Sequence, residues 1–277
     1  MMISAKAQRS ILFKIKYIPE HRYESTVSMT SNIEMNFENL SKEDSDKLIR
    51  KGITMPLLVN TSTISDLTIL AGKLSDQNTF PIIFRINSIK GTGTINGEEN
   101  PGGPTVISGE EMYATSTQTN ELHLDSISGR HLDTSLRQEL TATFNGVENE
   151  LRSSERMIKV GDTITQQIPY NMMINGLDAA FTITATYKLI SIKKGIAKFD
   201  IDQTSQFTMN KKGSSQVLTG KGGGHGSMTY DTKRNFPKTI SRDLSFDFEM
   251  QYKGILMKSK ATIVSYYFFS VVNSPAN

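Results

Sequence analysis

The chain has 277 residues, of which 37% are hydrophobic and 21% are charged, and its formal net charge at pH 7 is only +3. This length and composition permit one large packed domain, and so weak a positive charge predicts no nucleic-acid partner. The absence of cysteine excludes disulfides, thiolate metal sites and cysteine nucleophiles. No stretch approaches the ~20 apolar residues that a spanning helix needs, so we expect no transmembrane segment.

The first residues resemble a signal-peptide cleavage site. Ala5-Lys6-Ala7 has the small-x-small pattern, with Gln8 as the first mature residue. The alternative is a chance match in a frayed terminus. We interpret residues 1–9 as a signal-peptide remnant or a disordered terminus, which favours an exported protein that is periplasmic or associated with the cell envelope.

Alternation of apolar and polar residues dominates the N-terminal part. It predicts a strand over residues 11–17 and a longer return strand over residues 23–37, joined as a hairpin with one face in water. Residues 41–51 predict a short helix, with Ser41 as the N-cap and Gly52 as the stop. Strands are then expected over residues 57–60, 63–74 and 82–89, a glycine-rich loop over 91–104, and a further hairpin over 112–116 and 120–126.

One segment does not show this alternation of apolar and polar residues. Apolar residues recur every four positions near the middle of the chain, at Leu132, Leu136, Leu140 and Phe144. This spacing predicts an amphipathic helix over residues 134–145 that lies over a sheet.

The β pattern then returns. Val160-Gly161-Asp162-Thr163 predicts a turn into a strand, and residues 181–190 and 196–201 predict a hairpin around Lys193-Lys194-Gly195. Further strands are expected over residues 227–230, 243–252 and 255–272. The final run, residues 263–272, is apolar on both faces, which indicates a strand between two layers or one that lines a cavity with one face.

Together these elements predict a mainly β protein of two curved antiparallel sheets, forming half-barrel-like halves with one central amphipathic helix and a short helix in the N-terminal half. The expected organisation is an N-terminal β half (residues 10–130), a helix and connector (131–152) and a C-terminal β half (153–277), all within one continuous domain.

Three features resemble a known family. They are the opening segment Phe13 to Phe37, the turn at residues 159–163, and the closing run GSMTYDTKRNFPKTISRDLSFDFEM at residues 226–250. The chain resembles uncharacterised exported bacterial proteins, often lipoproteins, that carry a domain of unknown function. The resemblance implies a fold similar to the half-barrels of lipoprotein-localisation factors, and it brings no catalytic residues. The chain departs from the family in having Ile164 where many relatives have Trp, and in lacking a cysteine for lipidation.

The glycine-rich stretch TGKGGGHGS, residues 219–227, suggests a phosphate loop. A P-loop requires Gly-Lys-Ser/Thr at the start of a helix, but here Gly222 follows Lys221 and strand sequence comes next. We therefore expect a mobile loop between strands. No Gly-x-Ser-x-Gly motif of a serine hydrolase occurs either, so no catalytic residue and no cofactor is predicted.

The strongest metal candidate is a row of three side chains. Glu121, His123 and Asp125 alternate along a predicted strand and would share one face. Carboxylate and imidazole groups bind zinc or harder metals, although the same pattern is typical of the wet face of a strand. These residues are the metal candidates, and they would also form the site if the protein were a hydrolase.

The 13 methionines, which include Met29, Met35, Met172 and Met173, suggest a concave surface that adapts to an acyl chain. Gap-filling in a curved sheet is the alternative. The favoured hypothesis is a non-catalytic exported envelope protein that binds an apolar small molecule or lipid inside a curved sheet. The alternatives are a structural or interaction component with an envelope protein partner, and a hydrolase with a carboxylate-histidine site.

Overall fold

The computed structural model describes residues 10–50, 54–99, 108–119, 122–128, 141, 155–174, 177–210, 217–252 and 255–273. In this part of the chain, strands dominate and there is one helix with defined bounds, α1 (Lys42–Arg50). The strands before position 130 are β1 (Ser10–Phe13), β2 (His21–Glu38), β3 (Leu57–Ala71), β4 (Thr79–Ile95), β5 (Glu98–Glu99), β6 (Glu111–Thr117) and β7 (Leu122–Ile127). Those after it are β8 (Arg156–Lys159), β9 (Thr163–Ile174), β10 (Leu177–Lys193), β11 (Ile196–Asn210), β12 (Val217–Asp231), β13 (Phe236–Tyr252) and β14 (Ile255–Asn273). The expected mainly β class is confirmed.

Two antiparallel sheets are present, as the sequence predicts. The large sheet has twelve strands in the order β7-β6-β4-β3-β2-β14-β13-β12-β11-β10-β9, with β5 paired to β4. The small sheet pairs β1 with β8. The long pairing of β2 with β14 joins the two ends of the chain at the centre of the large sheet.

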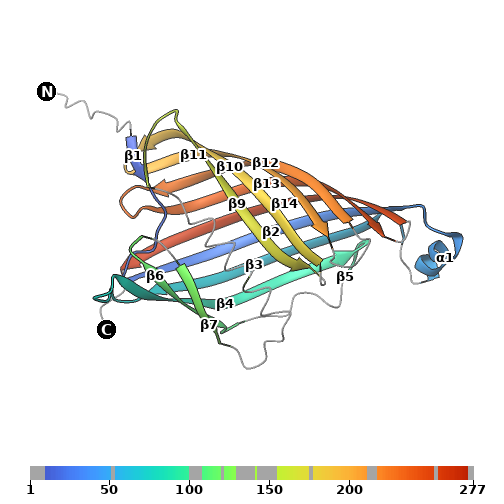
Figure 1. Ribbon diagram of the computed structural model, residues 1–277, viewed down its shortest axis with the longest axis horizontal. Coiled ribbons are helices and arrows are strands. Elements are labelled where there is room, and N and C mark those ends of the chain that lie inside the picture. Colours follow the sequence, from blue (N-terminus) through green and yellow to red (C-terminus); the bar gives the residue numbers. More distant parts are fainter. Residues whose placement is uncertain are drawn as a thin grey trace.

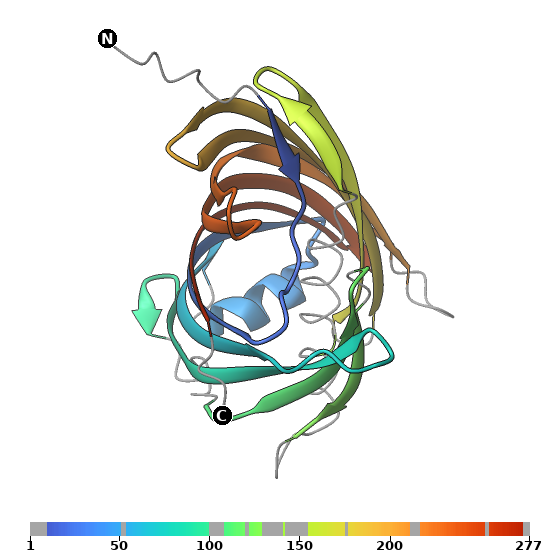
Figure 2. The same cartoon turned by 90° about the vertical axis from the view of Figure 1, so that its left-hand side faces the viewer.

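The large sheet is strongly curved. Figure 1 shows its strands side by side, with β9 and β10 crossing β2, β3 and β4 at an angle, and Figure 2 shows the sheet curling round, with α1 at the far end. Register shifts interrupt the ladders at Asp66/Leu67, Tyr113/Ala114, Leu189/Ser191 and Thr229/Tyr230. Such bulges bend a strand and increase its twist, so they help the sheet to curl.

The segment before β2 does not form the expected hairpin. β1 pairs with β8, while β2 pairs with β14 on one side and with β3 on the other. Since both edges of β2 are occupied, no ladder position is left for residues 11–17. They cross the near end of the curved sheet instead (Figure 2).

The cross-strand register shows which side chains share a face. Tyr23 on β2 lies in the buried cluster, so its alternate neighbours down to Phe37 also point inward. The intervening residues, from Arg22 to Asn36, point outward and are exposed. Charged, hydroxyl and amide groups therefore cover the outer face of β2, as expected for a face in contact with water.

Several local predictions are confirmed. The backbone N–H of Asp44 donates to Ser41 Oγ at 3.1 Å, which is the predicted N-cap of α1. β6 pairs with β7 and β10 with β11, as the two predicted hairpins require. The β10–β11 turn has Lys194 and Gly195 at φ of 51° and 78°, the left-handed conformations of a two-residue hairpin turn.

The loop expected over residues 219–227 is wrong, and so is the part over residues 91–95 of the loop expected over 91–104, whose residues 100–104 lie outside the described part of the chain. Gly91 and Gly93 continue β4, and residues 219–227 lie within β12, which is paired on both sides. A Cβ added at Gly224 or Gly226 would overlap a backbone carbonyl oxygen of β13. Glycine is needed in β12 because the backbones approach too closely for a side chain, and not because the segment turns.

The predicted central helix over residues 134–145 lies outside the described residues, apart from Thr141. The same is true of residues 1–9. Among the described residues, no helix has the length and apolar character needed to cross a membrane.

Candidate functional site

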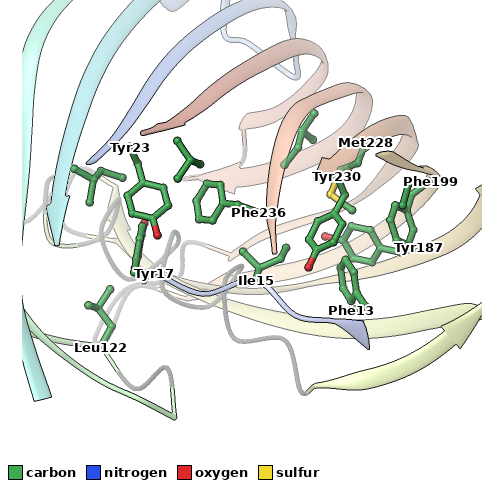
Figure 3. Close-up of a cluster of buried hydrophobic side chains, with 14 of the residues drawn as sticks. Phe13, Ile15, Tyr17, Tyr23, Leu122, Tyr187, Phe199, Met228, Tyr230 and Phe236 are labelled. Atoms are coloured by element: carbon green, nitrogen blue, oxygen red, sulfur yellow. The ribbon is translucent and has the colours of Figure 1, made fainter. Parts of the chain in front are cut away.

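The end of the sheet near β1 is packed. Inward side chains of β2, β11 and β12 meet the segment before β2, whose Ile11, Phe13, Ile15 and Tyr17 are all buried (Figure 3). The Phe13 ring lies 5.1 Å from the ring of Phe199 and 5.3 Å from that of Tyr230. This end of the interior is a side-chain core.

Two buried tyrosines tie the segment to the sheet. The N–H of Ile18 donates to the Tyr23 hydroxyl at 2.7 Å, and the Tyr230 hydroxyl donates to the carbonyl of Lys14. Burial raises the pKa of Tyr23 to about 12, and it also raises the pKa values of Tyr17 and Tyr230. These hydroxyls stay protonated at neutral pH and act as hydrogen-bonding anchors.

Toward α1 the inner face is less covered. Inward-facing Leu244, Phe246, Phe248 and Met250 on β13 are only half-buried, and Met29 on β2 is 41% exposed. Apolar side chains that line a curved sheet yet remain partly accessible indicate a hollow and not a second packed core. Among the described residues, the inner face is therefore packed at one end and only partly covered toward the other.

A pocket of about 350 Å³ lies where α1 meets the sheet. Most of its lining is apolar: Phe37 on β2, Leu40 just after β2, Leu48 on α1, Met250 on β13, and Ile255 and Met257 on β14. Asp44 and Lys47 of α1 form the polar part of the lining. The size and the mostly apolar lining match a small-molecule site with few polar contacts.

Polar groups also face the interior, farther from α1 than this pocket. Arg242 on β13 lies opposite Gly226 of β12 and Ser265 of β14, and its guanidinium is 5.4 Å from the centre of the Tyr267 ring. Burial lowers the pKa of Arg242 below its usual value, but an arginine remains charged at neutral pH. Arg242 thus places a positive charge against an aromatic ring on the inner face of the sheet.

Two buried polar side chains on β11 lie on the same face. Gln203 pairs with Gly224, and Ser205 with Gly222, while each is only 5% exposed. Gln203 Oε1 and Ser205 Oγ have no hydrogen-bond partner. Buried polar atoms normally have one, so these two are available to a bound polar group.

A larger groove of about 780 Å³ lies on the outer side of β9 to β13. Its lining is polar and includes Gln167, Thr184 and Gln206, with Lys221 and Asp247 on adjacent strands. The groove is open to solvent, and no aromatic residue lines it. It lacks the convergent polar and apolar groups that would define a site for a specific ligand.

The predicted metal candidates are only partly within the described residues. His123 Nδ1 lies 3.0 Å from Asp125 Oδ1, and both side chains are on the outer surface, 82% and 45% exposed. Glu121 lies outside the described residues. Within the described ranges no group of three potential metal ligands comes together.

The glycine-rich stretch forms no phosphate cradle. Lys221 and His225 point outward from β12, and the His225 ring is hydrogen-bonded to Asp202 on the neighbouring strand. Inward, the alternate glycines of β12 leave a stripe without side chains between β11 and β13.

Sequence reasoning missed Arg242. The signal was present, because Arg242 is in phase with Leu244, Phe246 and Phe248, the apolar positions of the alternating strand. An arginine at an inward position of a strand is unusual, since burying a charge is costly.

No protein-family model matches the chain, and no curated protein matches it. Solved structures with some similarity include Pseudomonas aeruginosa OccK7 (OpdD), at 6% identity and a TM-score of 0.29 over 90% of this chain and 99% of that one. A mutant of Rh. blastica porin has 10% identity and a TM-score of 0.27 over 89% of this chain and 100% of that one. These TM-scores are too low to support a functional conclusion, and neither similarity is to a lipoprotein-localisation factor.

Proposed function

We propose that the protein is a non-catalytic binding protein that holds an apolar or amphipathic ligand in the hollow of its curved sheet. The observation that carries this proposal is the pocket of about 350 Å³ beneath α1. Its lining includes Met250 of β13, and the half-buried apolar side chains of β13 lie on the same strand face as Met250. Apolar surface that folding leaves accessible inside a concavity is available for a ligand to bury.

The shape of the molecule supports this proposal. The segment before β2 packs across one end of the sheet, and among the described residues the short helix α1 lies at the other end (Figures 1 and 2). None of the residues of α1 is fully buried. Because a helix this short contributes little stability by itself, its displacement would give a ligand access at low cost.

We further propose that the protein is exported and works in the periplasm or at the cell envelope. The support is the small-x-small pattern at Ala5-Lys6-Ala7. Fractionation of the native host, with detection of the untagged chain, tests this directly. Recovery of the chain in the cytosolic fraction would refute it.

Ligand binding is tested on the purified full-length chain. Solvent extraction followed by mass spectrometry should recover a co-purified apolar or amphipathic compound, and the extracted protein should bind Nile red with increased fluorescence. Empty extracts together with no dye binding would refute the proposal.

A matched pair of variants locates the site. Leu48→Asp places a carboxylate in the pocket lining, and Ile49→Asp makes the same change at the next residue, which is 66% exposed and does not line the pocket. We expect Leu48→Asp to weaken dye binding at least about tenfold, because burying a charge in an apolar site is costly. Ile49→Asp should leave binding unchanged, and equal effects of the two variants would place the dye elsewhere.

A second candidate function is that of an interaction component of the envelope. Val264, Tyr266 and Phe268 form an apolar stripe on the outer face of β14, each about half exposed. Such a stripe is typical of a contact surface. Size-exclusion chromatography and pull-down from native envelopes, comparing the wild type with Tyr266→Ser, test this alternative, which a monomer with no captured partner would exclude.

A further inference from the structure

Charged side chains are rare at the inward positions of the large sheet that the structure describes. At the described inward positions of β2, β3, β4, β10, β11, β12, β13 and β14, Arg242 is the one Asp, Glu, Lys or Arg side chain. The other inward positions of β13 are apolar from Leu244 to Met250. The inner face of β13 therefore presents a cation at Arg242, followed along the strand by the apolar row from Leu244 to Met250.

The groups around Arg242 favour a ligand with a negative head. Ser265 lies opposite it on β14, and the aromatic ring of Tyr267 is next along that strand. Across the glycine stripe of β12, Gln203 and Ser205 on β11 provide polar atoms without partners. A hydroxyl can donate to an anion, and an amide side chain can turn to present its NH₂ group.

The glycines make this arrangement possible. Gly224 and Gly226 occupy the inward positions of β12 that separate Gln203 from Arg242. Two strand spacings amount to ~10 Å, a gap that a small head group and two long side chains can bridge when no side chain stands between them. The glycines therefore leave room for a head group between β11 and β13.

The apolar row from Leu244 to Met250 has the length of an acyl chain. From Leu244 to Met250, β13 runs six residues, or ~20 Å at the usual rise per residue. A single acyl chain in one bilayer leaflet spans ~15 Å. A tail that starts beside Arg242 would thus pass Phe246 and Phe248 and end near the pocket beneath α1.

We propose that the ligand is a single-chain anionic amphiphile, whose carboxylate is bound by Arg242 and whose tail lies along Leu244, Phe246 and Phe248 toward α1. This inference rests on the proposed function and adds the chemical class and orientation of the ligand. Ser259, a further buried hydroxyl without a partner, lies opposite Phe248 and is not part of the head-group site.

The test compares three amphiphiles with the same chain and different heads: palmitate, cetyl alcohol and cetyltrimethylammonium. Binding to the delipidated full-length chain is measured by displacement of Nile red at concentrations below micelle formation. We expect palmitate to bind about tenfold to a hundredfold more tightly than cetyl alcohol, as charge-assisted hydrogen bonds provide, and cetyltrimethylammonium to bind least.

Arg242→Gln should remove most of palmitate's advantage over the alcohol, whereas Arg242→Lys should retain part of it. The matched control is Arg234→Gln, which changes an exposed arginine in the β12–β13 turn and should have no effect. The comparison of head groups on the wild-type chain needs no variant, so the test stands even if Arg242→Gln does not fold.

The outcomes separate the two proposals. If palmitate and cetyl alcohol bind equally well to the wild type, or if Arg242→Gln leaves their ratio unchanged, the head-group inference is wrong while the binding function stands. If cetyltrimethylammonium binds most tightly, the site selects cations and the inference is also wrong. If none of the three binds, the proposed function itself fails.

Discussion

The packing of the segment before β2 can be tested at one residue, Phe13. Its side chain is 2% exposed and contacts Phe199, Tyr230 and Tyr187, with ring centroids 5.1, 5.3 and 6.4 Å away. Replacing a fully buried phenylalanine by alanine costs ~3–5 kcal/mol, since apolar burial is lost and a cavity remains. Each lost aromatic pair adds to the free energy lost with the buried area. We therefore expect Phe13→Ala to lower the free energy of unfolding by about 4 kcal/mol.

The matched control is the neighbouring residue on the opposite face of the same strand. Leu12 is 39% exposed, so Leu12→Ala should cost less than ~1 kcal/mol. Urea unfolding followed by far-ultraviolet circular dichroism gives both free energies, and the chain has no tryptophan to serve as a fluorescent probe. For a domain of this size, a loss of about 4 kcal/mol should also lower the Tm by ~8–16 °C.

Two results would refute this reasoning. If the two variants cost the same, the alternation along β1 does not place Phe13 inside and Leu12 outside. If Phe13→Ala costs less than ~1 kcal/mol, the segment is not part of the core, and the near end of the interior is as open as the end beneath α1.

Two further predictions concern the sheet and the anchoring tyrosines. Gly224→Ala would force a Cβ against a carbonyl oxygen of β13 and should lower the free energy of unfolding by at least ~2 kcal/mol in the same urea assay. His225→Ala, on the exposed face of the same strand, should lower it by under ~0.5 kcal/mol. Equal losses would contradict the close approach of the strands. The pKa of Tyr23 is raised from 10.0 to about 12, so its stabilising contribution is complete below pH 10.0 and is lost as the pH rises toward about 12. Unfolding free energies measured across this range should therefore fall more steeply for the wild type than for Tyr23→Phe, and parallel curves would show that Tyr23 does not titrate differently in the two states.

The sequence predicted the local structure well where local rules decide it. Alternation located most strands, Ser41 marked the start of α1, and Lys194-Gly195 marked a hairpin turn. These signals depend on neighbouring residues alone, through the two-residue side-chain period of a strand and the backbone preferences of a cap or turn.

The candidate site followed this pattern only in part. A concave apolar surface with methionines was expected, and Met250 and Met257 do line the pocket beneath α1. The side chains of Met172 and Met173 lie outside the described part of the structure. The row around His123 could be placed on one strand face from sequence, but whether that face was a cleft or the outer surface depended on the strands around it.

Pairing between distant strands was decided only by the tertiary structure. β2 carries the alternation of a hairpin strand, yet its partners are β14 and β3, because any strand edge can in principle pair with any other. The glycines of β12 resemble a loop in sequence and form a strand in the fold, since the close approach that requires them comes from β11 and β13. The sequence by itself determined which side chains of each strand share a face; only the curvature of the assembled sheet decided which face became the interior that Arg242 shares with Gln203 and Ser205.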